Sequence, residues 1–158
     1  MKKILIALDY DPLAEKVAQT GYDLAKALNA SVMLLHVVEE PSYYSTMEYS
    51  PVMGFVGFTS PDLYNVDDYL KKEAERFLEE SKKHLGDDTI ETSVVEGSFA
   101  DSIIEAAKGY NADLIVIGTH TRKWLDKLLM GDLAEKILHT SAVPVLAIPQ
   151  DPKPAAKS

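Results

Sequence analysis

Five apolar runs rich in Val, Ile and Leu alternate along the chain with segments of helical pattern, and this alternation constrains the fold most. Near-continuous apolar runs of this length are typical of strands buried on both faces. Strands that alternate with helices over short connections form a parallel sheet with helices on both sides. The sequence therefore predicts an α/β fold, a Rossmann-like five-stranded parallel sheet of order 3-2-1-4-5. Strands are expected at 2–9, 30–39, 90–97, 112–118 and 143–149, and helices at 10–30, 67–86, 99–110 and 132–140.

The helix starts carry local signals. Asp11 is expected to cap the first helix with Pro12 at its first position, and Ser98 is a candidate cap for the third. In the first helix Leu13, Val17, Leu24 and Leu28 recur at spacings that place them on one face, which predicts an amphipathic helix.

Length, composition and net charge narrow the class of protein. A length of 158 residues predicts one domain over 1–149, followed by a Pro- and Lys-rich tail at 150–158 that is expected to be disordered. The absence of Cys excludes disulfides and thiolate metal sites. A net charge of −9 disfavours nucleic acid as a partner. No run has membrane-spanning length, and the first apolar run ends at Asp9, too early for a signal peptide, so a cytoplasmic location is expected.

The segment 40–65 is much longer than a usual connection between a strand and a helix, and it is dense in Tyr, Phe and Met. This composition is not that of a solvated linker. Two interpretations stay open: the segment packs over the carboxyl edge of its own sheet, or it contributes to an interface with an unknown protein partner.

Ligands of open parallel sheets bind beyond the carboxyl ends of the strands, where the strand order reverses. Asp9 ends the first strand, Val37 lies near the end of the second, and Gly118 ends the fourth. In the predicted order Asp9 and Gly118 are neighbours. A carboxylate at the end of a buried strand requires a partner, either in the protein or in a ligand.

The stretch "GTHTRKWLDKLLMGD", residues 118–132, has the composition of a phosphate cradle. Gly118 permits a close turn off the strand, and Gly131 precedes a helix whose free N–H groups favour an anion. Arg122 and Lys123 add positive charge between them. The alternative is that both glycines serve the geometry of the chain alone.

Blocks of the sequence resemble the universal stress protein family from "KKILIALD" to "VPVLAI", in order and at family spacing. The matching pieces include "LLHVV", "ADLIVIGTH" and "LLMGDLAEKILHTSAVPVLAIP". The resemblance implies the α/β fold predicted above, and it implies a homodimer that pairs through the last strand, here through Val143, Val145 and Ile148.

The family's ATP-binding members carry a loop of the form Gly, two residues, Gly, nine residues, Gly, then Ser or Thr. Gly118 and Gly131 match the first and third glycines, but Thr121 replaces the second glycine and Asp132 replaces the hydroxyl residue. Thr121 adds a Cβ where the chain approaches the ligand. Asp132 removes a hydroxyl donor and places a carboxylate in a site that needs positive potential.

A carboxylate close to a phosphate at a partly solvated site opposes binding by about 1–4 kcal/mol, which weakens affinity roughly ten- to a thousandfold. Two alternatives remain for Asp132. A Mg²⁺ ion held with the nucleotide would bridge the carboxylate and the phosphates. Otherwise Asp132 caps the last helix and has no ligand role.

The resemblance implies that the adenosine half of the site is better kept. It assigns the ribose or base contact to Asp9, the backbone contact with adenine to Val37, the packing against the base to Ile117 and the floor to Ala7. The complete candidate set for ATP or AMP is Ala7, Asp9, Val37, Ile117, Gly118, Thr121, Gly131, Asp132 and Leu133. The four histidines match no metal signature, and no nucleophile elbow is present, so no metal site is expected, and no catalysis beyond, at most, slow hydrolysis of a nucleotide.

Two hypotheses follow from these observations. The first is a regulatory stress-response dimer whose adenine-nucleotide-type pocket has an altered phosphate loop. The second is a dimeric interaction protein that has lost ATP binding altogether.

Overall fold

The computed structural model describes residues 1–10, 12–38, 66–119 and 130–149. The expectations for 40–65, for Asp11 and for the tail at 150–158 therefore concern residues outside the described ranges. In chain order the elements are β1 (Lys3–Ala7), α1 (Ala14–Leu28), β2 (Ser31–Val38), α4 (Val66–Leu85), β3 (Glu91–Glu96), α5 (Phe99–Tyr110), β4 (Leu114–Gly118), α7 (Met130–Thr140) and β5 (Val145–Ile148). None of the helices in these ranges is long and apolar enough to cross a membrane.

The sheet is parallel throughout, and its strand order β3-β2-β1-β4-β5 confirms the predicted order 3-2-1-4-5. β1 lies at the centre, with Ile4 beside Val32 of β2 on one side and Leu114 of β4 on the other. β3 and β5 form the two edges of the sheet. The order reverses between β1 and β4, so the carboxyl ends of these two strands mark the switch point where a ligand is expected.

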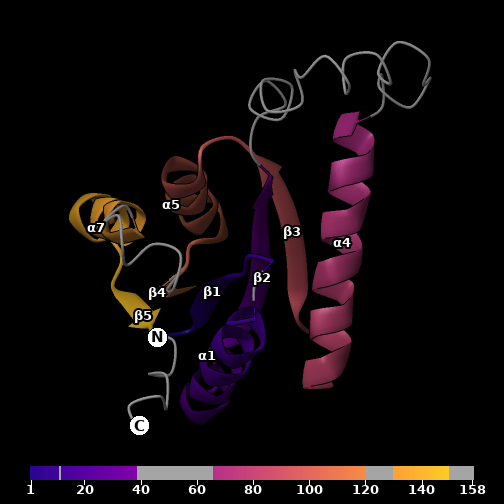
Figure 1. Ribbon diagram of the computed structural model, residues 1–158. Helices are drawn as coiled ribbons and strands as arrows, with labels where there is room; N and C mark the ends of the chain where they lie inside the picture. The colour runs from indigo at the N-terminus through magenta and orange to yellow at the C-terminus, as the bar shows by residue number, and fades with distance from the viewer. Residues whose placement is uncertain (11, 39–65, 120–129, 150–158) are drawn as a thin grey trace, which may run out of the picture.

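Alternate residues of each central strand enter two separate apolar cores. Ile4 and Ile6 of β1 pack in the core that contains α1 and Leu78 of α4. Leu5 packs in the core that contains α5 and Ile137 of α7. Figure 1 shows α1 and α4 on one side of the sheet and α5 and α7 on the other. The period of two along a strand therefore explains why both faces of the sheet are covered.

The first helix differs from its prediction. α1 begins at Ala14, and Leu13 occupies the N-cap position without a side-chain hydrogen bond, so Pro12 is not the first helical residue. Leu28, expected on the apolar face, is 41% exposed. Leu13 and Val17 are buried and Leu24 packs partly buried against the core, as predicted, and the buried face continues through Ala18, Gly21, Tyr22 and Ala25. The pattern of Leu and Val did not reveal the small residues of this face, which allow the helix to approach the sheet closely: a Cβ built on Gly21 would lie 2.6 Å from Ile6 Cδ1.

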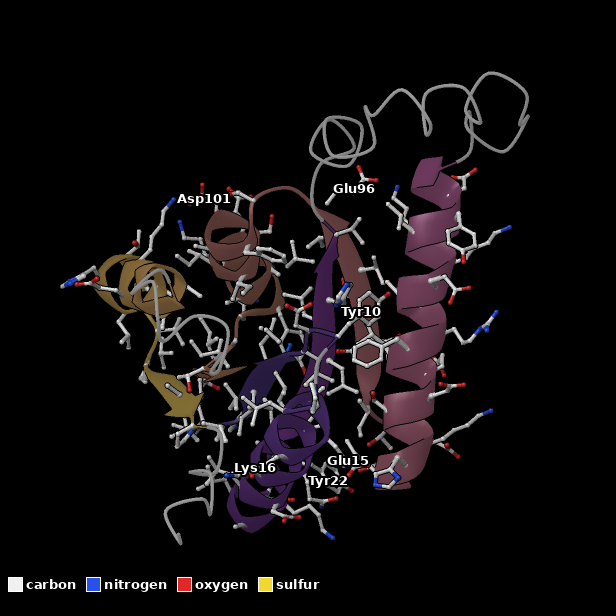
Figure 2. The ribbon with its side chains drawn as sticks, viewed as in Figure 1. Tyr10, Glu15, Lys16, Tyr22, Glu96 and Asp101 are labelled. Carbon is white, nitrogen blue, oxygen red and sulfur yellow. The ribbon has the colours of Figure 1, made fainter. Side chains whose placement is uncertain are left out.

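Ser98 stands at the N-cap of α5, but its side chain does not bond to the helix backbone. Its hydroxyl donates to Asp101 Oδ2 at 3.1 Å, and Lys136 Nζ of α7 lies 3.5 Å from Asp101 Oδ1. Figure 2 shows Asp101 at the end of α5 that lies next to α7. The expected cap is therefore wrong in its bonding, and the hydroxyl instead joins a polar link between two helices.

Asp113 fixes the start of the central strand. Its Oδ2 accepts the backbone N–H groups of Lys2 and Lys3 at 2.7 and 2.9 Å. The hydrogen bond from Lys2, and after it the one from Lys3, hold the pKa of the Asp113 carboxyl below its usual value. The ionised carboxylate thus ties the loop before β4 to the first residues of β1.

Candidate functional site

A pocket opens at the carboxyl edge of the sheet, at the switch point between β1 and β4. The sheet contributes its floor, α1 one wall, and α5 and α7 the other. The described residues enclose about 50 Å³, and all but one of the side chains are apolar. The lining consists of Ala7, Leu8, Asp9, Leu13, Ala14, Val17, Val37, Phe99, Ile103, Ile117, Gly118 and Ile137.

Five residues of the candidate set meet in this pocket, although they come from three strands and the loop after β1. They are Ala7, Asp9, Val37, Ile117 and Gly118. Thr121 lies outside the described residues. Gly131, Asp132 and Leu133 belong to the first turn of α7, and the structure does not describe their side chains. The adenosine half of the candidate site is therefore brought together around one pocket.

Asp9 is the charged residue of the described lining. β1 ends at Ala7, Leu8 still donates its N–H to Leu35 O at 2.8 Å, and Asp9 follows where the chain leaves the sheet. The Asp9 Oδ1 atom accepts the N–H of Tyr10 at 2.7 Å. The side chain is partly buried, so the carboxylate stands at the mouth of an otherwise apolar hollow.

Gly118 ends β4, and the reason for a glycine there is packing. A Cβ built on Gly118 would lie 2.7 Å from Val17 Cγ2 and 3.0 Å from Leu13 Cδ2. Contacts that short do not occur without displacement of a neighbour. The close approach of α1 to β4 therefore requires the missing side chain, and this favours the geometric interpretation of Gly118 over a role in phosphate binding.

The sequence reasoning missed the residues that helices contribute to the pocket. Phe99 and Ile103 come from α5, Ile137 from α7, and Leu13 and Val17 from the start of α1. In the sequence they are ordinary apolar positions of amphipathic helices, and their pattern does not distinguish a residue over the pocket from one over the core. Among these five residues, only Phe99 has a sequence feature that indicates a place at the pocket: it begins a helix directly after a strand and so lies at the carboxyl edge of the sheet.

The histidines of the described residues are spread across the fold. His36 is buried in β2, His84 lies 3.6 Å from Glu15 across the ends of α4 and α1, and His139 lies 3.8 Å from Glu135 on α7. Within the part of the chain that the structure describes, no three His, Asp or Glu side chains gather in a way that would hold a metal ion. His120 lies outside that part.

A parallel sheet of this order, with a pocket at the carboxyl edge of its switch point, defines the class of Rossmann-like α/β proteins. The model of the universal stress protein family matches residues 1–149. The chain therefore belongs to the universal stress protein family. Universal stress protein A homolog 1 of Coxiella burnetii is 33% identical over 147 residues, which cover 93% of this chain and 95% of that protein.

Solved structures agree on the fold. Universal stress protein MJ0577 of Methanocaldococcus jannaschii is 29% identical over 157 residues. The solved structure of MJ0577 superposes with a TM-score of 0.69 at 26% identity, over 96% of this chain and 98% of that one. A universal stress protein solved in complex with cAMP has a TM-score of 0.61 at 18% identity, over 93% of this chain and 95% of its own. At that identity the second likeness concerns the fold alone.

Proposed function

We propose that this universal stress protein is a regulatory dimer with an adenine-nucleotide-type pocket whose phosphate loop is altered, so that it binds nucleotide weakly or binds a changed ligand. The observation that carries the proposal is the meeting of Ala7, Asp9, Val37 and Ile117 around one pocket at the switch point of the sheet. The pocket lies where ligands of open parallel sheets bind.

The chemistry of the described lining fits a nucleoside better than a phosphate chain. Ala7, Val37, Ile117 and Phe99 offer apolar surface for a planar ring, and Asp9 offers a carboxylate that accepts hydrogen bonds from ribose hydroxyls or an amino group. No cationic side chain is among the lining residues that the structure describes. The enclosed 50 Å³ is far below the roughly 300 Å³ of a ligand pocket, so a nucleoside would extend beyond it over the carboxyl edge.

The proposed weakness toward triphosphates rests on Thr121 and Asp132. α7 begins at Met130, so Gly131 and Asp132 fall in its first turn, where free N–H groups favour an anion. A carboxylate in that turn competes with a phosphate for the same donors. A universal stress protein of the same fold was solved in complex with cAMP, which supports a nucleotide as the class of ligand, and cAMP carries one phosphate charge rather than several.

Regulation through a dimer is the second part of the proposal. β5 is an edge strand, and Val145 is only partly buried, which leaves backbone groups for a second copy to pair with. Val143 and Val145 pack against the core of α5 and α7, while Ile148 is buried on the other face. A ligand at the carboxyl edge would then alter a surface that an unknown cytoplasmic partner reads. We assign no catalysis to the pocket.

Calorimetry with ATP and with AMP, each with and without Mg²⁺, tests the proposal on three proteins. The wild type is expected to bind AMP more tightly than ATP, and the double variant Thr121→Gly, Asp132→Ser is expected to bind ATP at least about tenfold more tightly than the wild type. Asp9→Asn serves as the control for the pocket and should weaken binding of both ligands.

Three outcomes would change the conclusion. Micromolar binding of ATP by the wild type without Mg²⁺ would show that Asp132 does not oppose the phosphates. The same affinity only with Mg²⁺ would support the bridge through a metal ion. A wild type and a double variant that both bind nothing would favour the ligand-free interaction protein.

A further inference from the structure

His36 is the buried polar side chain of the described residues, with 4% of its surface exposed. It lies in β2 beside Val37, which lines the pocket, but alternate residues of a strand point to opposite faces. Val37 faces the core of α5 and α7, so His36 faces α4 from behind the pocket. A polar side chain in such a place is expected to make a defined hydrogen bond.

That hydrogen bond joins His36 to the chain that forms the pocket. The Nδ1 atom lies 2.9 Å from the carbonyl oxygen of Leu8. A carbonyl only accepts, so Nδ1 carries the hydrogen and donates it. Leu8 also donates its own N–H to Leu35 O at 2.8 Å. Both backbone groups of Leu8 are therefore held by β2, one residue before Asp9.

Tyr10 extends the same attachment. Its ring centroid lies 4.5 Å from that of His36 and 4.8 Å from that of Phe77 on α4. Figure 2 shows Tyr10 lying against α4. Its backbone N–H donates to Asp9 Oδ1 at 2.7 Å. The imidazole thus contacts the residues on both sides of Asp9, through a hydrogen bond on one side and a ring contact on the other.

We propose that His36 is a positioning residue for the pocket: it holds Leu8 and Tyr10 so that the carboxylate of Asp9 stays where a nucleoside-type ligand meets it. The proposal rests on the proposed function, because it concerns the same pocket. His36 does not line the pocket and acts only through its neighbours. An apolar ring would fill the same space but would leave the buried Leu8 carbonyl without its donor, which costs free energy on burial.

Two variants separate the hydrogen bond from the ring. His36→Asn places an amide N–H near the position of Nδ1 and removes most of the ring, whereas His36→Phe keeps a ring and removes the donor. Phe77→Leu is the matched control, because it alters the packing of the same ring cluster without touching the Leu8 hydrogen bond. All three are compared at a temperature at which each protein is folded.

The readouts are the affinity for AMP and the hydrogen exchange of the Leu8 and Tyr10 amides. If the loose segment is competent to bind for about a tenth of the time, the dissociation constant of His36→Phe rises about tenfold. We expect that rise together with faster exchange of both amides, while His36→Asn stays closer to the wild type in both. Phe77→Leu should lower the unfolding temperature and leave the affinity near that of the wild type.

The outcomes distinguish this proposal from the proposed function. A wild type and a Thr121→Gly, Asp132→Ser variant that both bind no nucleotide defeat the proposed function, but the exchange of the Leu8 and Tyr10 amides still decides whether His36 holds the segment. Unchanged exchange and affinity in His36→Phe would overturn the positioning role, as would equal losses of affinity in His36→Phe and Phe77→Leu. Ring ¹⁵N shifts that show Nδ1 without its hydrogen in the wild type would also overturn it.

Discussion

Gly118→Ala is the substitution whose effect the packing defines most closely. The new Cβ would lie 2.7 Å from Val17 Cγ2, and Val17 is only 2% exposed, so its side chain has little room to move. Overpacking of this kind costs about 1–3 kcal/mol of unfolding free energy. For a chain of this size each kcal/mol lowers Tm by about 2–4 °C. We therefore expect a loss of about 2–12 °C.

The assays are thermal unfolding, which measures Tm, and urea unfolding, in which the midpoint should shift and the slope stay unchanged, both followed by circular dichroism. Gly109→Ala is the matched control, because a Cβ there meets nothing within 4 Å and the residue lies inside α5. It should stabilise the protein by about 0.5–1 kcal/mol.

A double-mutant cycle with Val17→Ala tests the cause. That change removes the methyl group in the clash, so the double variant should be more stable than the sum of the two single changes predicts, by about 1 kcal/mol. Two results would refute the reasoning: a stability of Gly118→Ala within about 0.5 kcal/mol of the wild type, or strict additivity in the cycle. If Gly118→Ala lost nucleotide binding without losing stability, the result would favour a role of Gly118 in phosphate binding.

Substitutions at three further positions have defined outcomes. The pKa of the Asp113 carboxyl is lowered, so its contribution to stability is present above the ordinary value of 3.8 and is lost as the pH falls through the lower pKa of the folded state. When thermal unfolding is followed from pH 6 to about pH 3, Asp113→Asn should therefore lose less stability than the wild type. Asn111 ends α5 with φ of 61°, so Asn111→Ala should cost about 1 kcal/mol in urea unfolding and Asn111→Gly should cost nothing or stabilise. Burial first, and then the Glu91 carboxylate, raise the pKa of Tyr110 to about 12, while the Tyr110 hydroxyl meets no partner at hydrogen-bond geometry among the described residues. Tyr110→Phe should thus be neutral or stabilising, and a loss above about 1 kcal/mol would show that the hydroxyl bonds to the Glu91 carboxylate.

The architecture was predictable because the residue types of a short run are enough to indicate a buried strand. Runs such as "LIVIG" contain only β-branched and aliphatic residues before the glycine, and β4 occupies that run at Leu114–Gly118. The start of α1 was not predictable in the same way. Asp11 and Pro12 form a strong local signal for a helix start, yet α1 begins at Ala14, because helix ends depend on how the chain leaves the sheet as well as on capping residues.

Those residues of the candidate site that lie at the ends of strands were predictable. Asp9, Val37 and Gly118 follow from the rule that ligands meet the carboxyl ends of strands, and the pocket contains all three. The contribution of Ile103 and Ile137 was not predictable, because it depends on the rotation of α5 and α7 about their axes. From the sequence, His36 is only one residue of the strand expected at 30–39, because its hydrogen bond to Leu8 depends on the register between β1 and β2.

The central place of β1 also has a consequence for the order in which the molecule can be completed. β1 pairs on one side with β2, which follows it closely, but on the other side with β4, and the Lys3 N–H donates to a carboxylate 110 positions further along the chain. During synthesis the first half of the chain emerges with one edge of its innermost strand unpaired. Such an edge is a template for pairing with other chains. Until β4 has been synthesised, the central strand of the sheet therefore has one edge that can pair with another chain.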